Sequence, residues 1–258
     1  KPIWLAIEEA ISETNFAYTA GDSQTISGEY EGIFGWLSVN YILEQIGERS
    51  PRSFYGQLDL GGASTQITFP PVSKVILAQA YRVLVHSSET RVYSQSYMRS
   101  GQDQSMQRYA QLIANRDGSA AAHAALNSPC FNLGLNLNYS LLCGGASCMR
   151  LLVGTGNYTA CRKLTDALLN LEYECLLSPC AAHGVYQPSP LGVAFFAVSA
   201  FFFTANGIGL LGWNEQKSLS TAQVEDAGAA WCSRKWSEVA SKYASSFCFS
   251  SAYIPSLL

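Results

Sequence analysis

One short segment of this 258-residue chain is the most informative about its fold: Leu58-Asp59-Leu60-Gly61-Gly62-Ala63-Ser64-Thr65-Gln66. We expect strands at residues 54–59 and 65–69, before and after its glycines, because polar and apolar side chains alternate in the second of these runs. Two adjacent glycines between two strands are typical of a tight turn. The segment therefore predicts a β-hairpin with a glycine turn.

The same segment has residue types that suit a phosphate site. Glycines have no Cβ, so their backbone N–H groups can approach an anion closely. Asp59, at the end of the first strand, could hold a divalent cation through water, since magnesium keeps several of its waters. Ser64 and Gln66 lie two apart on one strand face and could orient a water molecule. The alternative is a plain hairpin, and these residues alone leave it open.

A second candidate residue, Glu31, lies in Gly28-Glu29-Tyr30-Glu31-Gly32. Residues 33–46 are apolar on most faces and predict a buried helix that ends at Gly47 and Pro51, with Glu31 preceding its N-terminus. A carboxylate at this place either interacts with the helix dipole or acts as a general base in a cleft. The pattern alone favours the helix-dipole interpretation.

The remaining pattern mixes strands with helices and indicates an α/β or α+β protein. An amphipathic surface helix is expected at 4–14, where Trp4 and Ile7 recur at helical spacing, and Ser220-Thr221-Ala222-Gln223 resembles a capping box. We also expect helices at 102–115 and 161–171, strands at 74–85 and 91–97, and an exposed loop at 117–127.

The charge balance excludes two classes of partner. The chain has 16 Lys and Arg against 19 Asp and Glu, for a net charge of −3, and its basic residues form no cluster. Polymeric nucleic acids and anionic lipid surfaces need a basic patch. We therefore expect no nucleic acid partner.

All eight cysteines lie between Cys130 and Cys248. An even number suits disulfides formed in an oxidising compartment. Zinc is the alternative, but the three histidines are scattered and the cysteine pairs lack the repeated spacing of zinc sites. Two glycosylation acceptor sequences, at Asn138 and Asn157, lie where a secreted domain would expose loops. We expect a secreted, cell-surface or secretory-lumen protein.

Residues 185–213 carry no charge and are long enough to span a membrane as a helix. Prolines near the start of this run and Asn206-Gly207 in its second part favour a buried strand and helix instead. The chain opens at Lys1-Pro2 without the pattern of a signal peptide, so we expect a fragment or a processed product, with no membrane anchor in this chain.

Three segments then follow one another with suitable gaps: Glu31 to Trp36 with Asn40-Tyr41, Leu58 to Phe69, and Phe196 to Phe203. They resemble the third, fourth and fifth conserved regions of the ecto-nucleoside triphosphate diphosphohydrolases, the apyrase family. The resemblance implies an α/β, actin-like (ribonuclease H-like) lobe that is disulfide-bonded and has helices packed on a mixed sheet. It also implies that residues 1–27 end the first lobe of a two-lobed apyrase and that residues 28–258 form the second.

The activity implied by this resemblance is hydrolysis of nucleoside tri- and diphosphates to the monophosphate, with Ca²⁺ or Mg²⁺ and with water as the nucleophile. The implied roles are a general base for Glu31, water-holding for Ser64 and Gln66, backbone contacts to phosphate for Gly61, Gly62 and Ala63, cation binding through water for Asp59, and nucleobase stacking for Phe202. Disulfides 130–161, 143–148, 175–180 and 232–248 are implied as well.

The chain also departs from the family. The first and second conserved regions lie upstream of anything present, so we expect this fragment to be inactive alone. Arg99 stands where membrane-bound animal members have a cysteine, and Gln102 stands where a basic residue often occurs. Two alternatives stay open: a catalytically silent extracellular nucleotide-binding module, and another actin-like phosphotransferase.

Overall fold

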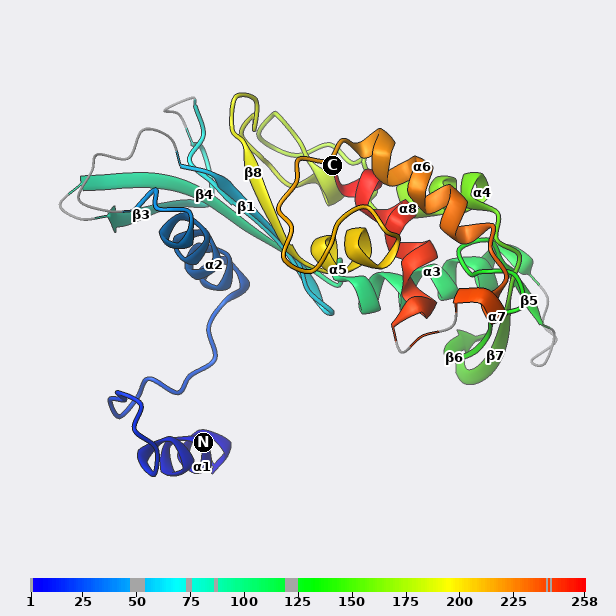
Figure 1. Ribbon diagram of the computed structural model, residues 1–258, viewed down its shortest axis with the longest axis horizontal. Helices are drawn as coiled ribbons and strands as arrows, with labels where there is room; N and C mark the ends of the chain where they lie inside the picture. Colours follow the sequence, from blue (N-terminus) through cyan, green and yellow to red (C-terminus); the bar gives the residue numbers. More distant parts are fainter. Residues whose placement is uncertain are drawn as a thin grey trace.

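The computed structural model describes residues 2–46, 54–72, 76–85, 88–118, 125–239, 241 and 243–258. Within them a five-stranded and a three-stranded sheet are packed with helices (Figure 1). The expected α/β class, with a mixed sheet and helices packed on it, is therefore confirmed.

The five-stranded sheet contains the predicted hairpin and has the strand order β3-β4-β2-β1-β8. Neighbouring strands are antiparallel, except that β1 and β8 run parallel. Asp59 of β1 lies opposite Gln66 of β2, and Gln66 lies opposite Ser96 of β4 on its other side. The strands are β1 (Gly56–Leu60), β2 (Ser64–Phe69), β3 (Ala80–Val85), β4 (Ser88–Met98) and β8 (Phe195–Ser199).

One face of this sheet is covered by α2 (Gly28–Ile42) (Figure 1). Strand side chains alternate between the two faces, and the polar side chains of Asp59, Ser64 and Gln66 lie on the α2 side. Next to these side chains, Ile33 and the fully buried Trp36 of α2 pack with Val85 and Val92 of the sheet. The apolar contacts fix α2 on the sheet, while its first turn lies over polar side chains.

The opposite face carries the largest hydrophobic core. Leu60 of β1 packs there with Tyr109, Phe201 and Tyr253 from three helices. These helices are α3 (Gln102–Asp117), α5 (Ala200–Gly207) and α8 (Phe247–Leu257), and the core continues into the second sheet, ordered β5-β7-β6. The second sheet consists of β5 (Leu126–Ser128), β6 (Asn136–Cys143) and β7 (Ala146–Gly154), flanked by α4 (Tyr158–Asp166), α6 (Thr221–Cys232) and α7 (Trp236–Val239).

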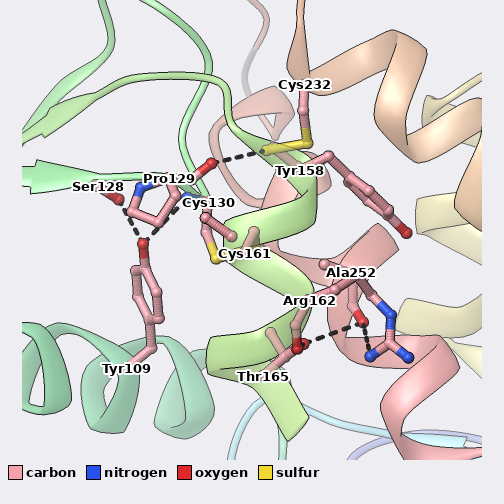
Figure 2. Close-up of a disulfide and its surroundings, with 12 residues drawn as sticks. Tyr109, Ser128, Pro129, Cys130, Tyr158, Cys161, Arg162, Thr165, Cys232 and Ala252 are labelled. Carbon is pink, nitrogen blue, oxygen red and sulfur yellow. Dashed lines mark hydrogen bonds between the residues drawn. A yellow bond between two sulfur atoms is a disulfide. The ribbon is translucent and has the colours of Figure 1, made fainter.

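Four disulfides pair all eight cysteines, and the pairing is the one that the family resemblance implied. Figure 2 shows Cys130–Cys161, which joins the segment after β5 to α4. Beside it, the Tyr109 hydroxyl of α3 accepts the Cys130 N–H at 3.1 Å and lies 2.8 Å from the Ser128 hydroxyl. The zinc alternative is wrong, because the disulfides use every thiol.

Several predicted boundaries need correction. Helix α2 begins at Gly28 rather than at residue 33, because Ser27 caps it by accepting the Tyr30 N–H, and it ends at Ile42. The predicted helix end at Gly47 and Pro51 lies outside the described residues. Strand β3 begins at Ala80 within the strand predicted at 74–85, of which residues 74 and 75 lie outside the described part.

Other corrections concern the second half. Helix α4 begins at Tyr158 and ends at Asp166 rather than spanning 161–171, because Asn157 caps it, and Leu171 is exposed. The loop expected at 117–127 is shorter, since α3 includes Asp117 and β5 begins at Leu126, while 119–124 lie outside the described residues. Asn138 lies in strand β6 rather than in a loop, although it is exposed.

The uncharged run at 185–213 forms β8 and α5, as its prolines and its Asn-Gly pair predicted. None of the helices in the described part of the chain is long and apolar enough to cross a membrane. The capping box at Ser220 opens α6 as predicted. The expected surface helix is present as α1 (Pro2–Ser12), which begins and ends two residues earlier than the predicted 4–14. It stands apart from the two sheets, and Trp4 and Ile7 are exposed (Figure 1).

Candidate active site

The hairpin brings three of the predicted site residues onto one face. Asp59 and Gln66 are paired across β1 and β2, and Ser64 lies two residues before Gln66 on the same strand. Side chains two apart on a strand point to the same side, which here is the side covered by α2. The register of the hairpin therefore places Asp59, Ser64 and Gln66 together.

Glu31 reaches this face from α2. It lies in the first turn of the helix, not before the helix as the sequence indicated, because the helix starts at Gly28. The Gln66 Nε2 donates to Glu31 Oε2 at 3.0 Å and to Ser64 Oγ at 2.8 Å. The structure thus joins Glu31 to Ser64 and Gln66, which lie more than 30 residues further along the chain, in one hydrogen-bonded group.

The surroundings of Glu31 favour its protonated form. Burial raises the pKa of the Glu31 carboxyl above its usual range, and the negative charge of Asp59 raises it further. A carboxylate with a raised pKa is a better proton acceptor at neutral pH than one with an ordinary pKa. The electrostatics therefore suit a general base as well as a partner of the helix dipole.

The Gln66 carboxamide has a defined orientation. Oxygens of Glu31, Ser64 and Ser96 surround one end of it, and a carboxylate can only accept, so this end is the NH₂ group. The Oε1 atom is at the other end, and none of the described residues donates a hydrogen bond to it. Gln66 can therefore bind Glu31 through its nitrogen and accept from a water molecule through its oxygen.

The glycine turn presents backbone N–H groups outward. The carbonyls of Gly61 and Gly62 accept N–H groups from the first turn of α3, and the Ala63 carbonyl accepts from Gly101. In a trans peptide the N–H points opposite to the C=O, so the next N–H in each case points away from α3. Within the described residues, the N–H groups of Gly62 and Ala63 have no acceptor.

Gly61 differs from the other two turn residues. Its N–H donates to the Ser64 carbonyl at 3.0 Å, which closes the hairpin turn. This group is therefore not free to bind an anion. Of the three residues expected to bind phosphate through the backbone, the structure leaves the N–H groups of Gly62 and Ala63 available.

Gly101 supports the turn and was not singled out as a site residue from the sequence. A Cβ at this position would lie 2.4 Å from the Ser64 nitrogen and 2.6 Å from the Ala63 backbone. Only glycine lets the start of α3 approach the turn this closely. The available signal was a glycine immediately before a predicted helix, which is too common a pattern to indicate this contact.

Asp59 has an unsatisfied oxygen. Its Oδ1 is buried and makes no hydrogen bond within the described residues. A buried acceptor without a partner is costly unless a cation or water binds it. The described residues hold no group of three or more His, Cys, Asp and Glu that could bind a metal ion. Asp59 fits a cation of the kind held by one carboxylate, water and substrate phosphates.

Phe202, the residue expected to stack on the nucleobase, takes no part in this hydrogen-bonded group. It is half-buried on α5, and its ring contacts Phe203 at 5.7 Å and Trp213 at 5.8 Å between centroids. Helix α5 begins directly after Ser199, which pairs with Leu60 beside the glycine turn. The aromatic cluster thus starts from the same edge of the sheet, and Trp213 was not anticipated.

The two positions that depart from the family pattern have structural roles. Arg99 adopts a left-handed backbone conformation with φ of 63°, and its carbonyl accepts from Arg108 of α3. The Gln102 Oε1 accepts from the Ser250 hydroxyl at 2.9 Å and so links α3 to α8. In this chain, position 102 connects two helices.

A carboxylate and a carboxamide lie beside outward-facing N–H groups of a glycine turn, and this arrangement can bind an anion and activate water. These features suit a hydrolase of phosphate compounds. The sequence pattern of the GDA1/CD39 (nucleoside phosphatase) family matches residues 6–258, and the chain belongs to this family.

Curated relatives agree with this assignment. Ectonucleoside triphosphate diphosphohydrolase 1 of Mus musculus is 33% identical over 267 residues, which cover 92% of this chain and 51% of the relative. Probable apyrase 4 of Arabidopsis thaliana is 29% identical over 92% of this chain and 48% of its own length. The chain therefore spans about half the length of the curated relatives it matches.

A solved structure shares the fold. The crystal structure of nucleoside triphosphate hydrolases from Neospora caninum superposes with a TM-score of 0.64 at 18% sequence identity, over 91% of this chain and 57% of that chain. The fold expected from the family resemblance is confirmed by this match.

Proposed function

We propose that this chain is the C-terminal lobe of a longer, apyrase-type enzyme that hydrolyses nucleoside tri- and diphosphates to the monophosphate. Residues 28–258 form the lobe, and residues 1–27 end the preceding one. The observation that carries the proposal is the hydrogen-bonded group of Glu31, Ser64 and Gln66 beside the free N–H groups of the glycine turn. The relative named ectonucleoside triphosphate diphosphohydrolase 1 supports it.

The role proposed for each residue is supported by its geometry. The Oε1 of Gln66 accepts a hydrogen bond from the attacking water, and Ser64 binds the same water from the neighbouring position. Glu31 takes the proton as the water attacks the terminal phosphorus in line with the leaving oxygen. The N–H groups of Gly62 and Ala63 bind the phosphate oxygens whose negative charge increases during the transfer.

Asp59 would hold Ca²⁺ or Mg²⁺ through the water shell of the ion, with its buried Oδ1 as the acceptor. A divalent cation there neutralises phosphate charge and polarises the transferred group. Phe202 would stack on the nucleobase. A ring face discriminates poorly between bases, so we expect broad nucleotide tolerance.

The proposed compartment is supported by the disulfides. Four disulfides and two acceptor sequences for glycosylation favour a secreted, cell-surface or secretory-lumen protein. The relatives include ecto-enzymes, which agrees with this location.

The test is phosphate release from ATP and ADP with Ca²⁺ or Mg²⁺, compared between this chain and a longer protein that adds the half found in the relatives. We expect turnover in the longer protein and little or none in the chain alone. Nucleotide binding without turnover in the longer protein would indicate a silent binding module. Phosphate transfer to glucose or glycerol would indicate a phosphotransferase.

A further inference from the structure

Ser96 of β4 lies outside the three segments that resemble conserved regions, yet its side chain reaches the site. The Ser96 Oγ lies 3.1 Å from the Gln66 Nε2, and the residue is only 8% exposed. The strand register fixes this contact, because Ser96 is the direct partner of Gln66 in the β2–β4 pair. Its position is therefore set by the sheet and not by a mobile loop.

Of the three oxygens around the Gln66 NH₂ group, that of Ser96 is the most firmly placed. Glu31 is exposed as a residue, with its carboxyl only partly buried, and Ser64 is half-buried at the start of β2 beside the turn. Ser96 is buried in the middle of the sheet, on the side of Gln66 away from Asp59. The carboxamide has two N–H groups, which the three oxygens share. The contact with Ser96 holds the nitrogen end between the strands and leaves Oε1 free to accept from water.

Ser96 also limits how closely the first turn of α2, which carries Glu31, approaches the sheet. A Cβ at Gly28 would lie 2.1 Å from Ser96 Oγ and 2.5 Å from Ser96 Cβ, so the first turn of α2 rests directly on this serine. Gly28 and Glu31 are three residues apart and lie on neighbouring positions of one helix face. The same side chain thus contacts both the amide and the support of the carboxylate.

We propose that Ser96 is a positioning residue that orients the Gln66 carboxamide, with Nε2 toward Glu31 and Oε1 toward the attacking water. Ser96 itself touches neither the water nor the phosphate. The proposal rests on the proposed function, since it assigns Ser96 to the same reaction.

The matched control is Ser94, two residues earlier on the same face of β4. Its hydroxyl lies 2.8 Å from Thr68 Oγ1 and donates to the Glu29 carbonyl at 2.9 Å, and it is fully buried. Ser94→Ala therefore removes buried hydrogen bonds under the same helix without touching Gln66. A merely structural role for Ser96 would make Ser96→Ala and Ser94→Ala equivalent.

The first experiment uses this chain and needs no activity. The side-chain amide ¹H–¹⁵N resonances of Gln66 are recorded for the unaltered chain, for Ser96→Ala and for Ser94→Ala, together with amide hydrogen exchange. We expect Ser96→Ala to shift these resonances and speed their exchange, while Ser94→Ala leaves both unchanged. Equal spectra for the two variants would overturn the proposal.

The second experiment measures turnover in the longer active protein. Ser96→Ala should lower kcat about tenfold with KM unchanged, because one directed hydrogen bond is lost and substrate contacts are not. Ser94→Ala should keep kcat. Full activity of Ser96→Ala would overturn the proposal. Full activity of Glu31→Gln would instead reject the proposed function, and the amide resonances of Gln66 would then test whether Ser96 orients the carboxamide.

Discussion

The site and the disulfide-bonded half of this chain are stabilised in different ways. Around Glu31 and Gln66, the chain has no covalent cross-link, and α2 rests on polar side chains through glycines. The region between Cys130 and Cys248 has four disulfides, and the largest apolar core packs the second sheet and its helices together. The first region depends on close fits and the second on burial and cross-links. We therefore expect the largest effects on turnover from changes in the first region and the largest effects on stability from changes in the second.

The largest effect expected is from Glu31→Gln in the longer active protein. The amide cannot take the proton, so kcat should fall by about 10² to 10⁴-fold while nucleotide binding and thermal unfolding stay unchanged. Glu29→Gln, in the same helical turn, is the control and should keep its activity. Steady-state phosphate release measures kcat for both variants. Retained turnover in Glu31→Gln would show that Glu31 is not the general base.

The next effect concerns the other region. Replacing Cys130 and Cys161 together by alanine opens a cross-link between residues 31 apart and should cost about 4 kcal/mol of unfolding free energy in the chain-entropy account. Removing Cys175–Cys180, with a separation of 5, should cost about 2 kcal/mol. Urea unfolding measures both. A larger loss from the shorter loop would contradict the chain-entropy account of this region.

The two regions also differ in what their sequence reveals. The hairpin follows from local alternation, and β8 with α5 follows from an uncharged run broken by prolines, so these elements were predictable. The four disulfide pairs came from the family resemblance. Spacing alone does not determine connectivity among eight cysteines.

The start of α2 was missed for a physical reason. Gly28 and Gly32 disfavour a helix by intrinsic propensity, so local pattern placed the helix start after them. The structure shows why they are present: each lies against side chains of the sheet with no room for a Cβ. Tertiary packing overrides propensity here, and the misplaced start put Glu31 outside the helix.

Contacts across strands were equally invisible in the sequence. Ser96 meets Gln66 only through the β2–β4 register, and the N–H groups of the glycine turn face outward because α3 binds their carbonyl neighbours. Both facts depend on segments far apart in the chain. A linear pattern can propose which residues act, but these long-range contacts decide how they are oriented.

A smaller effect should follow from Gly32→Ala, which tests the close fit directly. The new Cβ would lie 2.5 Å from Thr68 Oγ1 and 2.9 Å from Ser94 Oγ, so α2 must move away from the sheet. We expect a loss of about 1–3 kcal/mol in stability and a lower kcat, as Glu31 moves away from Gln66. At Gly212 a Cβ would meet nothing closer than 3.7 Å, so Gly212→Ala is the control. Unchanged stability and kcat in Gly32→Ala would show that the fit is loose.

The smallest expected effect is a shift in the titration of Glu31. Burial, and then the charge of Asp59, raise the pKa of its carboxyl, so between its unfolded and folded pKa values the native state binds more protons than the unfolded state. Ionised Glu31 therefore lowers stability as pH rises through this range, and the acidic limb of activity moves to higher pH. Asp59→Asn removes the second cause and should lower the Glu31 pKa, as measured by carboxyl NMR titration of this chain. Asp103 is not among the causes, so Asp103→Asn should leave the titration unchanged. If Asp103→Asn lowered the Glu31 pKa and Asp59→Asn did not, Glu31 and Asp59 would not be electrostatically coupled. The site would then not differ from the disulfide-bonded region through the interaction of its two carboxyls.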